Sequence, residues 1–155
     1  MDSITPEQLQ EAISCLPTAQ ETADGCNCEH VLAIYLLLLE AGVTATLKVC
    51  LRTENDITGE QPPVTIYSHA VVQAFETTWD EQGTEAVDRW EAYWRARQDM
   101  DCRFSWKAIR GADIVRAFEA YRSSYQQEEL QLDKVTELLN LMRIITSSQL
   151  EGEVA

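Results

Sequence analysis

The sequence is short of basic residues. Its 155 residues include only 12 Lys and Arg against 26 Asp and Glu, which gives a formal net charge of −14. Because binding to nucleic acid depends on neutralising phosphates with basic side chains, we expect no nucleic-acid ligand. Anionic membrane surfaces are disfavoured for the same reason. The charge does allow a basic protein partner, which an acidic surface attracts over a distance.

The sequence also has no long apolar stretch and no paired cysteine spacing. The longest apolar run covers residues 31–39, about half of the ~20 residues that a transmembrane helix needs. The first ten residues are acidic and polar, unlike a secretory signal. Five cysteines, at positions 15, 26, 28, 50 and 102, are an odd number without the spacing of a disulfide scaffold. We therefore expect free thiols in a reducing, cytoplasmic compartment.

The composition is typical of a single globular domain. Hydrophobic residues make up 45% of the chain and charged residues 25%, which is ordinary usage for a folded protein with its own core. We expect one domain over residues 1–155. It would contain a central segment at 25–80, a helical part at 84–146 and a frayed tail at 147–155.

Apolar periodicity predicts an α+β fold. Residues 27–41 are apolar at nearly every position from 31 to 39 and are followed by Gly42, as in a buried helix that ends at a glycine. Residues 44–52 alternate between apolar and polar, and residues 64–75 are rich in β-branched and aromatic side chains. These two segments predict an antiparallel pair of strands that packs on the apolar helix.

The remaining elements are predicted to be mostly helical. Thr5 followed by Pro6 and then Gln8 is the pattern of a capped helix start. Residues 104–109 are a candidate third strand. Helical spacing of apolar residues recurs at 87–94, 114–125 and 135–145. The predicted architecture is a central apolar helix on a small antiparallel sheet, with a helical C-terminal half that closes the other side.

Two cysteines lie where a turn leads into the central helix. Cys26 and Cys28 follow Asp24-Gly25, and the first amides of a helix have no partner within the helix. The positive end of the helix dipole stabilises a thiolate at this place. The same amides can donate to the oxyanion that forms when a thiolate attacks a carbonyl.

Such a nucleophile needs a base, and the chain offers two histidines. His30 comes two residues after Cys28 and therefore points to a different side of the helix. His69 lies in the middle of the second predicted strand. If its face of the strand packs on the start of the central helix, Cys28 and His69 can meet.

The order of these features resembles the papain-like superfamily, in particular its transglutaminase-like and glutamine-deamidase branches. Residues 25–30 read Gly-Cys-Asn-Cys-Glu-His and match the helix start, and residues 69–72 read His-Ala-Val-Val and match the histidine strand. The resemblance covers about residues 25–80. It implies that Cys28 is the nucleophile, His69 its base and Asp80 the group that orients the base.

Alternatives remain at two positions. Cys26 fits the place of the nucleophile comparably well, and Asp101 or Gln73 could orient the base in place of Asp80. A zinc site built from Cys26, Cys28 and His30, with His69 or Cys50, would lack the second cysteine pair that structural zinc sites usually have. We therefore expect no metal and no cofactor.

Two functions follow from these patterns. The first is an acyl-transfer enzyme in which a cysteine thiolate attacks an amide, either a glutamine side chain or a peptide of a protein substrate, and His69 protonates the leaving amine. The second is a non-enzymatic acidic protein, such as an inhibitor, immunity or adaptor protein, that docks a basic partner. In that case the cysteines are small buried side chains and His69 is a hydrogen-bonded strand residue.

Overall fold

The computed structural model describes residues 3–17, 28–96, 100–110, 113, 116 and 131–154. The described helices are α1 (Pro6–Ser14), α2 (Cys28–Glu40), α3 (Ala86–Arg95) and α5 (Leu132–Val154). The described strands are β1 (Thr46–Asp56), β2 (Val64–Ala74), β3 (Thr77–Asp80), β4 (Gly83–Thr84) and β5 (Met100–Ile109). The α+β class predicted from the sequence is confirmed. None of the described helices has the length and apolar content needed to cross a bilayer.

The strands form one antiparallel sheet in the order β4-β3-β2-β1-β5. β1 and β2 pair as the sequence predicts, and β5 pairs with β1 along its other edge. Cys50 of β1 lies opposite His69 of β2 on one side and opposite Trp106 of β5 on the other. These three residues therefore form a row across the middle of the sheet.

The helix ends agree with the sequence signals. The side-chain oxygen of Thr5 accepts from the backbone of Gln8, and the Gln8 side chain accepts from the backbone of Thr5, so the first helix has a complete capping box. After α2, Gly42 has a φ of +75° and the backbone N–H of Val43 reaches the carbonyl of Leu38 at 2.9 Å. This left-handed residue closes the helix as predicted.

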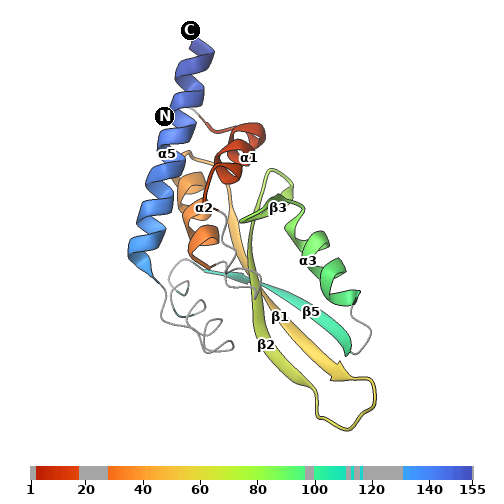
Figure 1. The fold of residues 1–155 in the computed structure, drawn as a ribbon. Coiled ribbons are helices and arrows are strands. Elements are labelled where there is room, and N and C mark those ends of the chain that lie inside the picture. Colours follow the sequence, from red (N-terminus) through yellow and green to blue (C-terminus); the bar gives the residue numbers. More distant parts are fainter. Residues whose placement is uncertain are drawn as a thin grey trace.

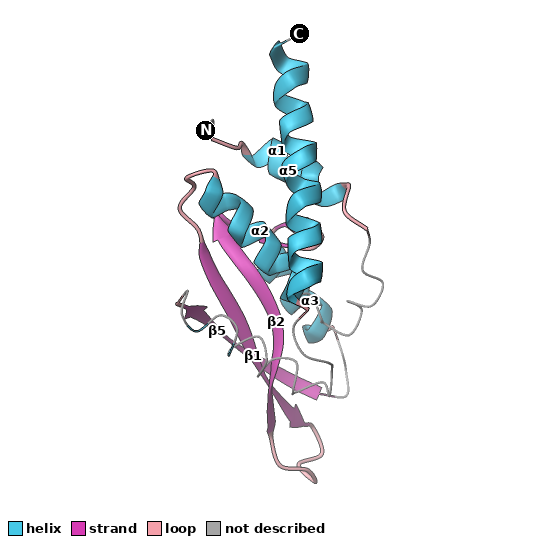
Figure 2. Ribbon diagram, turned by 90° about the vertical axis from the view of Figure 1, so that its left-hand side faces the viewer, coloured by secondary structure: helices cyan, strands magenta, loops and turns pink. Residues whose placement is uncertain are grey.

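Helices cover both faces of the sheet. In Figures 1 and 2, α2 lies on one face with α5 packed against its outer side, whereas α3 lies on the other face. Buried aliphatic side chains from α1, α2, α5 and the strands make the core on the α2 face. Along β2, Ala70 and Val72 belong to this core, so the alternate residues His69 and Val71 point to the α3 face.

The second half of the chain differs in part from the predicted helical half. β5 begins at Met100 rather than at 104 and has ten residues. The last helix runs from Leu132 to Val154, past the point where a frayed tail is expected. The predicted helix at 114–125 lies outside the described residues.

Candidate functional site

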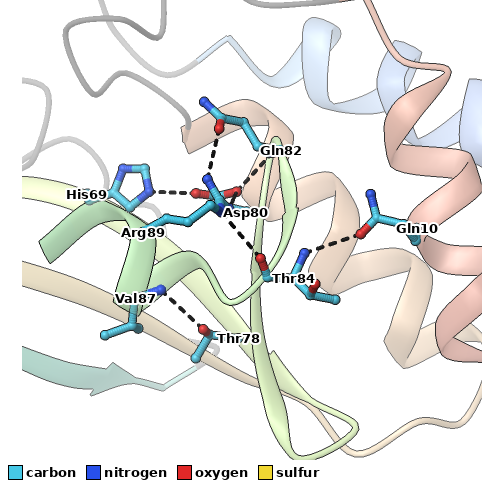
Figure 3. A network of polar contacts seen from close by, with 8 residues as sticks. All are labelled: Gln10, His69, Thr78, Asp80, Gln82, Thr84, Val87 and Arg89. Carbon is cyan, nitrogen blue, oxygen red and sulfur yellow. Dashed lines mark hydrogen bonds and ion pairs between the residues drawn. The ribbon is translucent and has the colours of Figure 1, made fainter. Parts of the chain in front are cut away.

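His69 and Asp80 form a buried pair on the α3 face of the sheet. The His69 Nε2 atom lies 3.0 Å from Asp80 Oδ2, and each residue is only 2% exposed (Figure 3). A tight turn between β2 and β3 brings the two strands side by side. Trp79 opposes Val72 in the core, so the next residue, Asp80, points to the same face as His69.

Asp80 accepts hydrogen bonds with both of its carboxylate oxygens. Besides His69, it is contacted by Arg89 of α3, whose Nη2 lies 2.7 Å from Oδ1, and by the backbone N–H of Gln82 at 2.8 Å from the same oxygen. Burial raises the pKa of the Asp80 carboxyl, but the His69, Gln82 and Arg89 contacts together outweigh burial and lower the pKa below its ordinary value. The carboxylate is therefore charged at neutral pH.

The contacts of His69 fix the chemistry of its ring. A carboxylate accepts hydrogen bonds only, so in the neutral imidazole Nε2 carries the proton and Nδ1 carries the lone pair. Nδ1 is buried and has no hydrogen-bond partner among the described residues. The ring stacks on Trp90 of α3 with centroids 5.2 Å apart and meets the edge of Trp106 at 6.4 Å. The result is an oriented imidazole with one nitrogen available to accept a proton.

Cys28 is the first residue of α2 and is fully buried. Its side chain belongs to the aliphatic core on the α2 face, whereas the His69 ring contacts residues of α3 and β5. Figures 1 and 2 agree that the first turn of α2 lies beside the middle of β2. The face of β2 that packs on α2 is therefore the one with Ala70 and Val72, not the His69 face expected from the sequence, and Cys28 and the His69–Asp80 pair lie on opposite faces of the sheet. Cys26 lies outside the described residues.

The structure places the other candidates for the orienting group away from His69. Gln73 is exposed on β2, opposite Thr46 and Thr78. Asp101 is exposed on β5, opposite Asn55. Of the three residues considered from the sequence, Asp80 is the one that contacts the imidazole.

A different cysteine lies next to His69 across the sheet. Cys50 is opposite His69 in the pairing of β1 and β2 and is fully buried. Burial, together with the negative charge of Glu91, raises the pKa of the Cys50 thiol to about 12. This thiol stays protonated at neutral pH, which makes it a poor nucleophile despite its position.

The pair does not have the surroundings of a metal site. Within the described residues, His69, Asp80 and Glu81 bring possible ligand atoms within 4.8 Å of one another. Asp80, however, already accepts from His69, Gln82 and Arg89, and a cation would have to displace the guanidinium. His30, considered for zinc from the sequence, reaches the carbonyl oxygen of Pro17 at 3.4 Å.

Sequence reasoning missed two parts of this site. Trp90 falls within the predicted helix at 87–94, and its stacking on His69 depends on where that helix docks. Arg89 gave no signal at all, because one arginine in an amphipathic helix is most simply a solvated residue.

No protein family, curated protein or solved structure matches the chain at a significant level. The site is therefore defined by its geometry alone, as a buried His–Asp pair held by a partly exposed arginine on a sheet in an α+β protein.

Proposed function

We propose that this protein is a cysteine-nucleophile acyl-transfer enzyme that acts on an amide. The observation that carries the proposal is the His69–Asp80 pair, with Nε2 held by the carboxylate at 3.0 Å and the buried Nδ1 without a hydrogen-bond partner in the part of the chain that the structure describes. An imidazole that is oriented through one nitrogen and carries a free lone pair on the other is suited to general-base catalysis. The resemblance in the sequence assigns this pair the same two roles.

The nucleophile would be a thiol at the start of α2. Cys28 is the first candidate and Cys26 the second. Because Cys28 lies in the core on the opposite face of the sheet from His69, this proposal requires the start of α2 to rearrange so that the thiol can pass its proton to Nδ1 of His69. The thiolate then attacks the carbonyl carbon of the amide. The imidazolium then donates that proton to the leaving amine as the carbon–nitrogen bond breaks. Water or a second amine attacks the thioester, which releases the acyl product and restores the thiol.

Asp80 stabilises this cycle through His69. Its carboxylate holds the ring in one tautomer and offers a negative charge to the imidazolium that forms in the first step. The amides at the start of α2 would donate to the oxyanion of the tetrahedral intermediate. The substrate class that fits is a glutamine side chain or a peptide bond of a protein.

Alkylation with iodoacetamide between pH 5 and pH 9, with each modified cysteine identified by mass spectrometry, tests the proposal. We expect one cysteine at the start of α2 to react quickly at about pH 6, well below the ordinary thiol pKa of about 8.5. Exposed Cys15 provides the comparison within the same molecule. Cys28→Ala and Cys26→Ala variants decide which of the two thiols reacts, and His69→Ala should abolish the fast reaction.

Slow alkylation of the thiols at the start of α2 would favour the second function, an acidic protein that docks a basic partner. If both thiols at the start of α2 react no faster than Cys15 at pH 6, the enzyme proposal is wrong. The net charge of −14 then favours an acidic protein that docks a basic partner. Because Cys28 is fully buried, the same experiment also measures whether a small reagent reaches its sulfur.

A further inference from the structure

We infer that Arg89 is a positioning residue for the proposed catalytic pair: it fixes Asp80 in the orientation that binds His69 and balances the charge of that carboxylate. The catalytic benefit of this positioning rests on the proposed function. The positioning itself concerns only Arg89, Asp80 and His69 and can be tested separately. No pattern in the sequence assigns a function to Arg89.

Three contacts hold the guanidinium of Arg89 against the β3–β4 turn. Nη2 donates to Asp80 Oδ1 at 2.7 Å, Nη1 donates to the side-chain oxygen of Gln82 at 2.8 Å, and Nε donates to the carbonyl oxygen of Thr84 at 3.3 Å (Figure 3). A planar guanidinium with donors in fixed directions sets the position of every group that it binds. Arg89 thus holds the carboxylate of Asp80 through Oδ1, the oxygen that does not contact His69.

The charges of the cluster give the second part of the argument. Asp80 is 2% exposed, and a carboxylate at such a depth requires a partner of opposite charge. Arg89 provides it and remains 37% exposed, so its own cost of burial is small. With the guanidinium in place, the buried carboxylate is neutralised without a proton on His69. The guanidinium therefore also keeps the carboxylate in the charged form that accepts the hydrogen bond from His69 Nε2.

The surrounding contacts fix the elements that carry this cluster. The backbone N–H of Val87, at the start of α3, donates to the side-chain oxygen of Thr78 on β3 at 3.2 Å (Figure 3). On the other side, the side-chain oxygen of Gln10 on α1 accepts from the backbone N–H of Thr84 at 3.3 Å. Gly83 leaves room for this contact, since a Cβ there would lie 2.3 Å from the Gln10 side-chain oxygen. Both the turn and the helix that Arg89 connects are therefore held in place.

Nuclear magnetic resonance of the imidazoles tests the inference directly, because the chain has only two histidines. In the unaltered protein at pH 7, we expect His69 to show a single Nε2–H tautomer with a slowly exchanging proton. In Arg89→Gln, this proton should exchange faster or its signal should be lost, because Asp80 is no longer held in place. Arg89→Lys keeps the positive charge but lacks the several fixed donors of a guanidinium, and it should restore part of the signal.

Matched controls separate this role from a general structural one. Arg95→Gln removes another arginine of α3, which pairs with Glu91, and should leave the His69 signals unchanged. The His30 signals should not move in any of these variants, and the dispersion of the backbone amide spectrum reports that each variant is folded. A folded Arg89→Gln protein with an unchanged His69 spectrum would overturn the inference.

The alkylation rate links the inference to the proposed function while keeping the two distinguishable. If a thiol at the start of α2 reacts quickly at pH 6, Arg89→Gln should slow it by about tenfold, and Arg89→Lys by less, because the base is less well oriented. Slow alkylation in every variant, together with a His69 spectrum that depends on Arg89, would end the enzyme proposal and leave the positioning role standing.

Discussion

The two faces of the sheet are built from alternate residues of the same strands, yet they differ in chemistry. On the α2 face, Leu47, Val49, Ala70 and Val72 contribute only hydrocarbon. On the α3 face, the residues next to them include Cys50, Arg52, His69 and, on β3, Asp80. The comparison shows how a strand period of two lets one sheet supply a stabilising core and a separate polar site.

The polar face is tolerated because its charged groups have partners. Arg52, only 3% exposed, pairs with Glu54 at 2.7 Å, and its guanidinium carbon lies 3.5 Å from the ring centroid of Trp94. Asp80 has His69 and Arg89. Since a buried charge without a partner is strongly unfavourable, truncating one member of such a set should cost more than its own contacts suggest.

The largest effect is expected on the aliphatic face. Leu38 of α2 is fully buried in the core, so Leu38→Ala should lower the free energy of unfolding by about 2–5 kcal/mol. Leu39→Ala on the same helix is the control, because that side chain is 47% exposed and should cost much less. Urea unfolding followed by circular dichroism measures both. Equal losses would contradict the assignment of the core to this face.

The next effect is expected at Asp80 and should depend on pH. The pKa of this carboxyl is lowered in the folded state, so its contribution to stability is fully present above the unfolded value of about 3.9 and is lost as the pH falls through the folded value. We expect Asp80→Asn to cost about 1–3 kcal/mol at pH 7 and less in acid. Urea unfolding at pH 7 and pH 3 measures the difference. Asp101→Asn, on exposed β5, is the control, and a deficit that stays constant with pH would refute the electrostatic explanation.

The smallest effect is expected from the aromatic cover of Arg52. Trp94→Leu keeps an apolar side chain on α3 but removes the ring on which the guanidinium stacks, and it should cost about 1–2 kcal/mol. Tyr93→Leu is the matched control, since Tyr93 is 64% exposed. Thermal unfolding of the two variants side by side makes the measurement. A Trp94 variant as stable as the Tyr93 variant would show that the stacking contributes nothing.

Local signals in the sequence predicted the elements that local interactions determine. The Thr5 capping box and the end of α2 at Gly42 appear as expected. The alternation of residues 44–52 holds only as far as Val49, because Cys50 and Arg52 are buried and Leu51 is half-buried. Each of these depends on residues within a few positions of one another. The pairing of β1 with β2 followed because a short connection joins two adjacent strands.

The elements that sequence reasoning missed depend on unusual turns or on distant contacts. β3 escaped notice because its turn from β2 uses Phe75 and Glu76 with φ of 54° and 61°, where Asn or Gly would have been the usual signal. The place of β5 beside β1 brings together segments about fifty residues apart, which no local pattern encodes. The contact of Asp80 with His69 follows from the first of these features, and the ring contacts of Trp106 follow from the second.

The position of α5 has a consequence for how the chain acquires its structure during synthesis. α2 is almost entirely apolar, and Val135, Leu138 and Met142 of α5 complete the core on its outer side. Roughly ninety residues separate the two helices in the sequence, so a ribosome working at about 5–20 residues per second exposes α2 for several seconds before its cover emerges. A nascent chain that has not reached α5 presents a hydrophobic helix to the cell, and we expect it to depend on chaperones during that interval.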